Sequence, residues 1–226
     1  MSSSCPLSAS PQTTEAPDVA VDNDVLIKAA CYGFAAELDA SRSLGVLGAA
    51  RYVVPKRIDR MSLSGDRNVA RTAALDLIAR GSPLEPSSDE LALAAAIETA
   101  AQRRGLQLDT GESQLAAMTL LREIAFLETG DKRAIRGFER LVDELAELRP
   151  LCGRLRCLEQ IVSGCLNAVG PDTFAHAVCG EPDVDRTLSI CFRCYSPPPQ
   201  GRALDPDALD SYIADLRGSA PRLLVP

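Results

Sequence analysis

The sequence predicts an α/β fold in which helices cover a mostly parallel central sheet. Short β-branched apolar runs alternate with longer segments whose apolar residues recur at helical spacing. Residues 112–148 read in succession as helix, strand and helix, the alternation typical of parallel strands and their crossovers. At 226 residues the chain is long enough for one sizeable core, or for a main domain with a smaller appendage.

The first third of the chain predicts two strands and one helix. Residues 19–27 form an apolar run typical of a buried strand, and residues 28–40, rich in Ala, Leu and Glu, favour a helix. The short apolar run at Tyr52–Val54 predicts a second strand, and Pro55 would end it. The basic segment that follows has mixed helical character.

The middle of the chain carries the clearest helix signals. Ser87 or Ser88 is the N-cap of a helix that ends before Gly105, and Gly111 opens a second helix. A short strand is predicted at residues 124–129, followed by a Gly-Asp turn and an amphipathic helix. The apolar face of that helix consists of Ile135, Phe138, Leu141, Val142, Leu145 and Leu148.

Beyond Pro150 the sequence pattern is weaker. Residues 154–170 favour a helix, residues 171–195 are irregular, and residues 205–217 predict a short final helix. We therefore expect a disordered leader at 1–18, a main α/β domain at 19–150 and a C-terminal extension at 151–226. The extension is predicted to be helical and then irregular.

Composition argues against several classes of protein. A net charge of −7 does not suit a protein that coats nucleic acid by bulk attraction, although a local basic excess from Arg42 to Arg80 suits either phosphates or a solvated surface. No apolar run approaches the ~20 residues of a membrane span, and no secretory signal is recognisable, so we expect no membrane contact and a cytoplasmic location. Nucleotide-binding glycine motifs are missing, and a single histidine argues against a Ser-His-Asp hydrolase.

Eight cysteines raise the question of a metal site or disulfides. Without a secretory signal, disulfides are not expected. A zinc site around Cys179, Cys191 and Cys194 is one alternative, but the spacings match known sites loosely. Buried structural thiols are the favoured interpretation.

Acidic residues lie where parallel strands are predicted to end. Asp22 and Asp24 interrupt the run at 19–27, Asp131 follows the strand at 124–129, and Glu112 opens a helix. Each has an ordinary explanation, such as an N-cap for Asp131 and a favourable helix-dipole charge for Glu112. Asp22 is the hardest to explain in this way, because a buried strand rarely holds an unpaired carboxylate. Gathered at strand ends, these acids would suit Mg²⁺ or Mn²⁺.

Three short motifs resemble those of the PIN-domain nuclease family: "VDNDVLI", "LDTGESQLAA" and "FLETGDKRAI". The resemblance covers about residues 19–148 and implies that the domain at 19–150 is PIN-like. The proteins that it resembles include bacterial toxin-type ribonucleases. It implies a three-layer α/β/α fold and metal-dependent hydrolysis of RNA. Asp22, Glu112 and Asp131 would be catalytic acids, and Asp24 would join them as a metal ligand for Mg²⁺ or Mn²⁺. Lys28 and Lys132 are candidate phosphate contacts.

One acid that the family usually carries is not matched in "VVPKRIDRM". Either Asp59 substitutes for it, Asp109 fills the gap, or the metal site is incomplete. A metal-dependent endoribonuclease acting on single-stranded or structured RNA is therefore the leading hypothesis. A catalytically silent PIN-like interaction module is the alternative. Toxin-type relatives also imply an antitoxin or other protein partner, and a homodimer.

Overall fold

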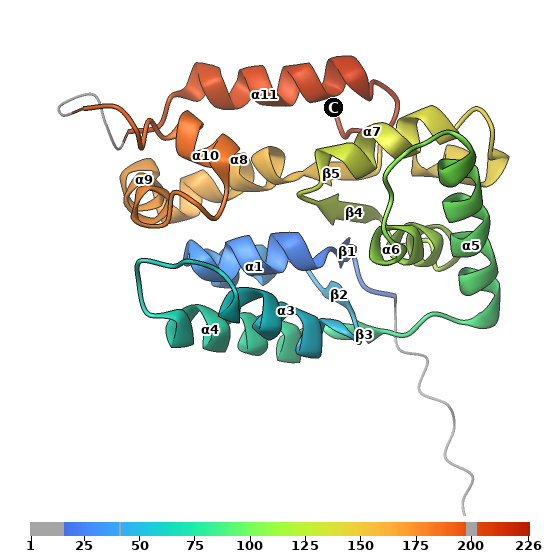
Figure 1. Ribbon diagram of the computed structural model, residues 1–226, viewed down its shortest axis with the longest axis horizontal. Helices are drawn as coiled ribbons and strands as arrows, with labels where there is room; N and C mark the ends of the chain where they lie inside the picture. Colours follow the sequence, from blue (N-terminus) through green and yellow to red (C-terminus); the bar gives the residue numbers. More distant parts are fainter. Residues whose placement is uncertain (1–15, 41, 198–202) are drawn as a thin grey trace, which may run out of the picture.

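The computed structural model of the protein describes residues 16–40, 42–197 and 203–226 (Figure 1). The predicted leader at 1–18 therefore lies almost wholly outside the described residues. A five-stranded sheet forms the centre, in the order β3-β2-β1-β4-β5, and all of its pairs are parallel. Its strands are β1 (Val19–Val21), β2 (Leu44–Leu47), β3 (Ser82–Leu84), β4 (Phe126–Thr129) and β5 (Leu155–Cys157). The predicted α/β class is confirmed.

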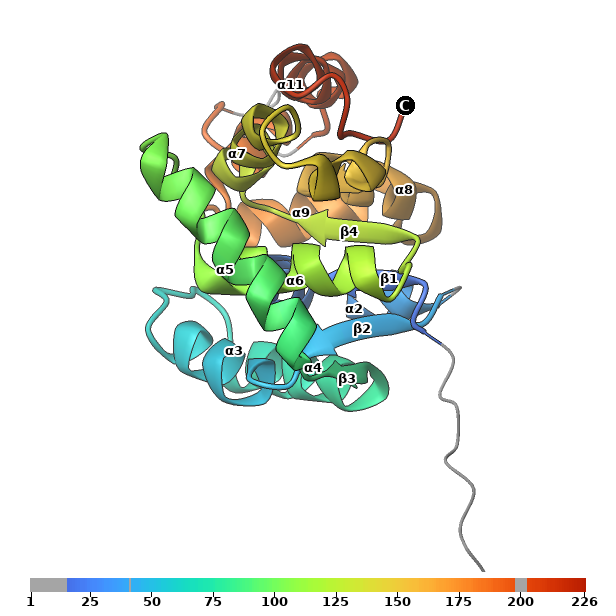
Figure 2. The ribbon, with the colours of Figure 1, turned by 90° about the vertical axis from the view of Figure 1, so that its right-hand side faces the viewer.

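Helices cover the sheet, and Figure 2 shows α5 and α6 in front of the strands and α3 and α4 below them. The N-terminal helices are α1 (Asn23–Cys31), α2 (Ala35–Asp39), α3 (Ala50–Asp59), α4 (Arg67–Arg80), α5 (Ser88–Arg103) and α6 (Thr110–Leu121). The C-terminal ones are α7 (Lys132–Leu141), α8 (Leu158–Val169), α9 (Pro171–Gly180), α10 (Arg186–Cys191) and α11 (Pro206–Ser219), with a 3-10 helix at Ala146–Leu151. No helix among the described residues combines the length and the apolar character needed to cross a membrane.

The central strands are buried on both faces. Every residue of β1 and β2 is buried, as expected for interior parallel strands, which read as continuous apolar runs rather than as alternating ones. Burial of this apolar surface supplies most of the free energy that holds the layers together.

The strand predicted at 19–27 is much shorter than expected, and the prediction for its second half is wrong. β1 ends at Val21, and Asp22 takes an extended conformation as the N-cap of α1. A buried apolar run has the same composition in a strand and in a buried helix, so the periodicity alone did not separate them. The predicted helix at 28–40 is in fact two helices, because α1 ends at Cys31 and Gly33 adopts a positive φ of 74° before α2.

The prediction of a strand at Tyr52–Val54 is also wrong. These residues belong to α3, which contains Pro55, and the strand lies earlier at Leu44–Leu47. Tyr52 is 60% exposed, so it could not have been part of an interior strand. The glycines that flank Val46 obscured the true strand in the sequence.

The predictions for the middle of the chain are confirmed in kind. Ser87 caps α5 with a reciprocal capping box to Glu90. The helix predicted after Gly111 is α6, the strand is β4, and the amphipathic helix is α7. It is shorter than predicted, because α7 ends at Leu141 and Leu148 belongs to the 3-10 helix that follows.

Residues beyond 150 contribute to the same sheet. β5 pairs with β4, and Leu224 forms an isolated parallel bridge with Leu155, so the end of the chain lies beside the sheet edge. The helix predicted at 154–170 is strand β5 followed by α8, and the segment predicted to be irregular contains α9 and α10. The short final helix predicted at 205–217 is α11.

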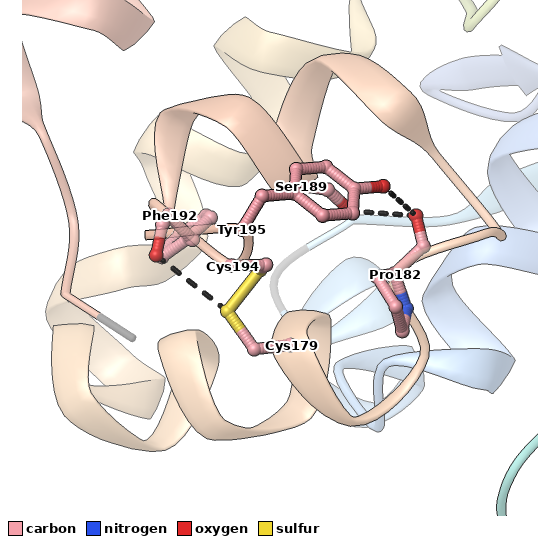
Figure 3. Close-up of a disulfide and its surroundings, with 6 residues drawn as sticks. All are labelled: Cys179, Pro182, Ser189, Phe192, Cys194 and Tyr195. Carbon is pink, nitrogen blue, oxygen red and sulfur yellow. Dashed lines mark hydrogen bonds between the residues drawn. A yellow bond between two sulfur atoms is a disulfide. The ribbon is translucent and has the colours of Figure 1, made fainter. Parts of the chain in front are cut away.

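One disulfide joins Cys179 at the end of α9 to Cys194 beyond α10 (Figure 3). The expectation that all cysteines are reduced is therefore wrong for this pair. The structure also overturns the zinc alternative as stated, because Cys179 and Cys194 no longer supply thiolates. Cys191 remains a free, buried thiol, and burial raises its pKa to about 12.

Candidate functional site

The strands β1 and β4 pair with each other, and the strand that follows each of them in the chain lies on the opposite side of this pair. β1 leads to β2 on one side, and β4 leads to β5 on the other. In parallel α/β sheets, ligands bind outside the carboxyl ends of the strands at such a switch point. Asp22 directly follows β1, and Asp131 follows β4 after Gly130.

A cavity of about 720 Å³ lies at this point. Acids from three distant parts of the chain line it, together with the amides of Asn23 and Gln114 and the guanidinium groups of Arg57 and Arg133. The acids are Asp22, Asp24, Asp109, Glu112 and Asp131. The structure therefore places all four predicted metal ligands around one cavity.

Helix starts position most of these acids. Asp22, Asp109 and Asp131 are the N-caps of α1, α6 and α7, so three helix N-termini converge on the cavity. The Asp131 carboxylate accepts from the backbone N–H of Arg133 at 2.7 Å. Asp109 and Glu112 form a capping box whose two hydrogen bonds are both 2.8 Å long. The ordinary explanations of Asp131 and Glu112 therefore hold, and they coexist with the shared cavity.

Two of the acids have raised pKa values. Burial raises the pKa of Asp22 to about 6, and the neighbouring charge of Asp24 adds to the effect. Burial likewise raises the pKa of Glu112 to about 8, with further contributions from the charges of Asp109, Asp131 and Asp22. Within the described part of the chain, no cation pairs with Asp22, Asp109 or Glu112. Three of the five acids that line the cavity thus have no basic partner of their own among the described residues.

The other two acids do have basic partners. Asp24 lies 2.5 Å from the Lys28 ammonium and 3.7 Å from a guanidinium nitrogen of Arg57. Asp131 pairs with Arg133 at 2.6 Å. Burial would raise the pKa of Asp131, but the hydrogen bonds from Arg133 outweigh it and the pKa lies below its usual value.

Of the remaining candidate residues, only Asp109 lines the cavity. Asp109 lines the cavity, whereas Asp59, at the end of α3, lies 3.8 Å from Arg71 and not among the lining residues. Lys28 is buried between Asp24 and Asp185. Lys132 contacts Glu159 at 2.6 Å and the hydroxyl of Thr187 at 2.9 Å. Both lysines are thus engaged inside the protein.

The donor set suits a hard divalent cation, since all its ligand atoms are oxygens. Among the described residues, however, no three His, Cys, Asp or Glu side chains stand close enough together to hold an ion as they are arranged. The ion pairs of Asp24 and Asp131 and the capping box of Glu112 turn these carboxylates toward their own partners. These carboxylates would have to turn away from their present partners to face one ion.

One contributor to this region was missed in the sequence, and another was noted only as part of the basic segment from Arg42 to Arg80. Arg57 lines the cavity from α3, and Asp185 of the C-terminal extension reaches Lys28. No short-range pattern points to either, because each acts through a contact between distant segments.

No protein-family model, curated protein or solved structure matches this chain. Functional conclusions therefore depend on the site itself.

Proposed function

We propose that this chain is a metal-dependent endoribonuclease of PIN-like fold, which hydrolyses RNA phosphodiester bonds at the acidic cavity. The observation that supports it most is the convergence of five carboxylates on one cavity at the carboxyl ends of β1 and β4. Asp22, Asp24, Glu112 and Asp131 would hold Mg²⁺ or Mn²⁺, and Asp109 would supply the acid that Asp59 does not. Bound there, such an ion would lower the pKa of an attacking water and offset negative charge on the phosphate.

The chain's own residues have separate tasks in this proposal. Arg57 and Arg133 line the same cavity, so they are the cations best placed to contact a substrate phosphate. Glu112, with a pKa of about 8, holds a proton at neutral pH and would release it if a cation were bound by its carboxylate. The single-stranded form of RNA suits the site, because its backbone is the easiest to present to an open cavity.

Cleavage of a fluorescently labelled single-stranded RNA tests the proposal. We expect cleavage with Mg²⁺ or Mn²⁺, its loss with a chelator, and a loss of at least about 100-fold in Asp22→Ala and Asp131→Ala. Asp59→Ala is the matched control, because Asp59 lies outside the cavity and should retain activity. A matched DNA strand tests the preference for RNA. Equal activity in all three variants would reject the site.

A catalytically silent interaction module is the second candidate, and one observation favours it. The described acids are not arranged as a ready-made ligand set, and two of them are already paired with cations. In that case the acidic cavity would contact a basic segment of a partner protein. Calorimetric titration separates the two candidates: heat of Mn²⁺ binding supports the nuclease, and no binding at millimolar Mn²⁺ supports the silent module.

A further inference from the structure

Lys28 connects the acidic cavity to the C-terminal extension. Its ammonium lies 2.5 Å from Oδ2 of Asp24 and 2.8 Å from Oδ2 of Asp185, and its side chain is 10% exposed. Burial lowers the pKa of Lys28, but the charges of Asp24 and Asp185 together outweigh burial and raise it. Lys28 is therefore a cation shared between two carboxylates, one on each side of a tertiary contact.

Asp185 is held in the orientation that this contact needs. It is the N-cap of α10, and its Oδ1 accepts from the backbone N–H of Leu188 at 2.8 Å. The cap occupies one carboxylate oxygen and leaves the other for Lys28. The position of Asp185 therefore depends on the segment that carries α10.

The disulfide closes this segment. Cys179 and Cys194 bracket residues 180–193, so Asp185 lies inside the covalent loop (Figure 3). Within it, the hydroxyl of Ser189 donates to the carbonyl oxygen of Pro182 at 2.7 Å. The hydroxyl of Tyr195, directly after the loop, lies 3.4 Å from the same oxygen. The loop is thus tied together by one covalent bond and by contacts at Pro182.

The same loop makes a second contact with the N-terminal half. The carboxylate of Glu181 accepts from the backbone N–H groups of Ser64 and Gly65, at 2.7 and 2.5 Å, in the connection between α3 and α4. Val184 of the loop lines a smaller cavity with Asp24, Lys28 and Arg57, next to the acidic cavity. The loop therefore forms part of the wall beside Asp24.

We infer that Lys28 and Asp185 are positioning residues for Asp24, and that the Cys179–Cys194 disulfide, by holding Asp185, sets the cation affinity of the acidic cavity. The inference rests on the proposed metal-dependent function. Asp24, Lys28 and Asp185 together carry one negative charge, and without Asp185 at Lys28 that charge falls to zero. Lys28 would then act on Asp24 alone and compete with the incoming cation.

The switching step is a thiol–disulfide exchange with a dithiol reductant. One thiolate of the reductant attacks a sulfur of the disulfide, the S–S bond breaks, and a mixed disulfide forms. The second thiol of the reductant then releases the mixed disulfide. Cys179 and Cys194 end as two thiols, the reductant ends as a disulfide, and two electrons and two protons have passed to the protein.

The first experiment compares Mn²⁺ binding in oxidised protein, in protein reduced with dithiothreitol and freed of it, and in Cys179→Ser/Cys194→Ser. We expect the reduced protein and the double variant to bind Mn²⁺ about threefold to tenfold more weakly than the oxidised protein. Hydrogen exchange is the second readout. Reduction should speed exchange in residues 181–192 and in the first turn of α1. Equal affinity and equal exchange in the two redox states would overturn the redox link.

Substitutions test the positioning roles directly. Asp185→Asn keeps a good N-cap but removes the charge, so Mn²⁺ affinity should fall by about threefold to tenfold. Asp183→Asn is the matched control, because exposed Asp183 makes the same charge change two residues away. Lys28→Gln/Asp185→Asn restores the local charge to that of Asp24 alone, and its affinity should return toward the wild-type value. An equal loss in Asp183→Asn, or no recovery in the double variant, would overturn the positioning roles.

Failure of the proposed function gives a different result. If no form binds Mn²⁺, the metal site is rejected. The exchange measurement then decides the contact alone: faster exchange in the first turn of α1 in Asp185→Asn than in Asp183→Asn supports the positioning of Asp24, and equal exchange overturns it.

Discussion

The carboxylate of Asp24 occupies the space next to Gly130 in which any other residue would carry its Cβ atom: a Cβ at position 130 would lie 2.2 Å from Oδ2 of Asp24. The same atom would lie 3.2 Å from the Lys28 ammonium. The turn between β4 and α7 can approach Asp24 this closely only because residue 130 has no side chain. This turn follows β4, and α1 follows β1, so the contact between them joins the carboxyl ends of these two strands.

Gly130→Ala should therefore disturb the cavity more than the fold. The Asp24 carboxylate is the end of a side chain and can move, so we expect a small change in melting temperature. Mn²⁺ affinity should fall by about tenfold, because the displaced carboxylate would no longer be available as one of the proposed ligands. Calorimetric titration measures this loss. Gly164→Ala in α8 is the matched control, since its Cβ would meet no atom within 4 Å, and it should bind Mn²⁺ normally.

The stability of the metal-free protein should fall as pH rises. Glu112 has a pKa of about 8 in the folded protein and an ordinary value near 4.5 when unfolded, so between these values the folded state binds more protons. The free energy of unfolding should decrease through this window by on the order of 2–4 kcal/mol. Asp22, with a pKa of about 6, contributes in the same direction at the lower end.

Urea unfolding at pH 5 to 9 in the presence of chelator measures this dependence. Glu112→Gln should lose the decrease between pH 6 and 8 while retaining its capping hydrogen bond, because Gln also serves at this position of a capping box. A wild-type protein whose stability is flat from pH 6 to 8 would contradict the prediction.

Mn²⁺ binding should have the opposite dependence on pH. In the proposed site a cation would bind the ionised form of Glu112, so apparent affinity should increase up to pH 8, by at most about tenfold per pH unit for one released proton. Titration at pH 7 in two buffers of different ionisation enthalpy counts the protons released. Glu112→Gln should release fewer protons than the wild type, and an equal number would place the titrating group elsewhere.

The pair Glu90–Arg122 should stabilise the fold independently of the cavity. Arg122 donates to both carboxylate oxygens of Glu90, at 2.6 and 2.8 Å, and joins the end of α6 to the start of α5. The hydrogen bonds from Arg122 lower the pKa of Glu90 to about 2. Arg122→Met leaves this carboxylate buried and unpaired, so it should cost about 2–3 kcal/mol in chemical denaturation.

Arg103→Met is the control for that measurement, because its guanidinium is 66% exposed and 3.5 Å from Glu144. It should change stability by less than about 0.5 kcal/mol. Because the pKa of Glu90 is lowered on folding, its contribution is complete above pH 4.5 and is lost as pH falls toward 2. The difference between wild type and Arg122→Met should shrink over that range.

Helix starts are the features that could be predicted most reliably from the sequence. The capping boxes at Ser87 and Asp109 and the turn at Gly130 act within about four residues, so their residue types are visible in the chain itself. The acids were singled out on other grounds: Asp22 and Asp24 interrupt a predicted strand, Asp131 follows one and Glu112 opens a helix. Asp22 and Asp131 follow β1 and β4, whereas Asp109 and Glu112 lie at the start of α6, which follows α5, so their place in the cavity depends on how α6 packs.

The predictions failed where an apolar run had two stable forms. Residues 25–27 and 52–54 are apolar enough for a strand, yet the structure places them in α1 and α3. Whether such a run forms a helix or a strand depends on the segments it packs against, and these lie elsewhere in the chain.

By itself, the sequence determined the α/β class, the helix starts near Ser87, Gly111 and Asp131, and the identity of the candidate acids, because these depend on neighbours a few residues away. Only the tertiary structure decided that five of these acids line one cavity, that Asp109 and not Asp59 is among them, and that Asp185 reaches Lys28. These outcomes depend on the strand order β3-β2-β1-β4-β5, which is set by the simultaneous burial of all the apolar faces rather than by any local pattern.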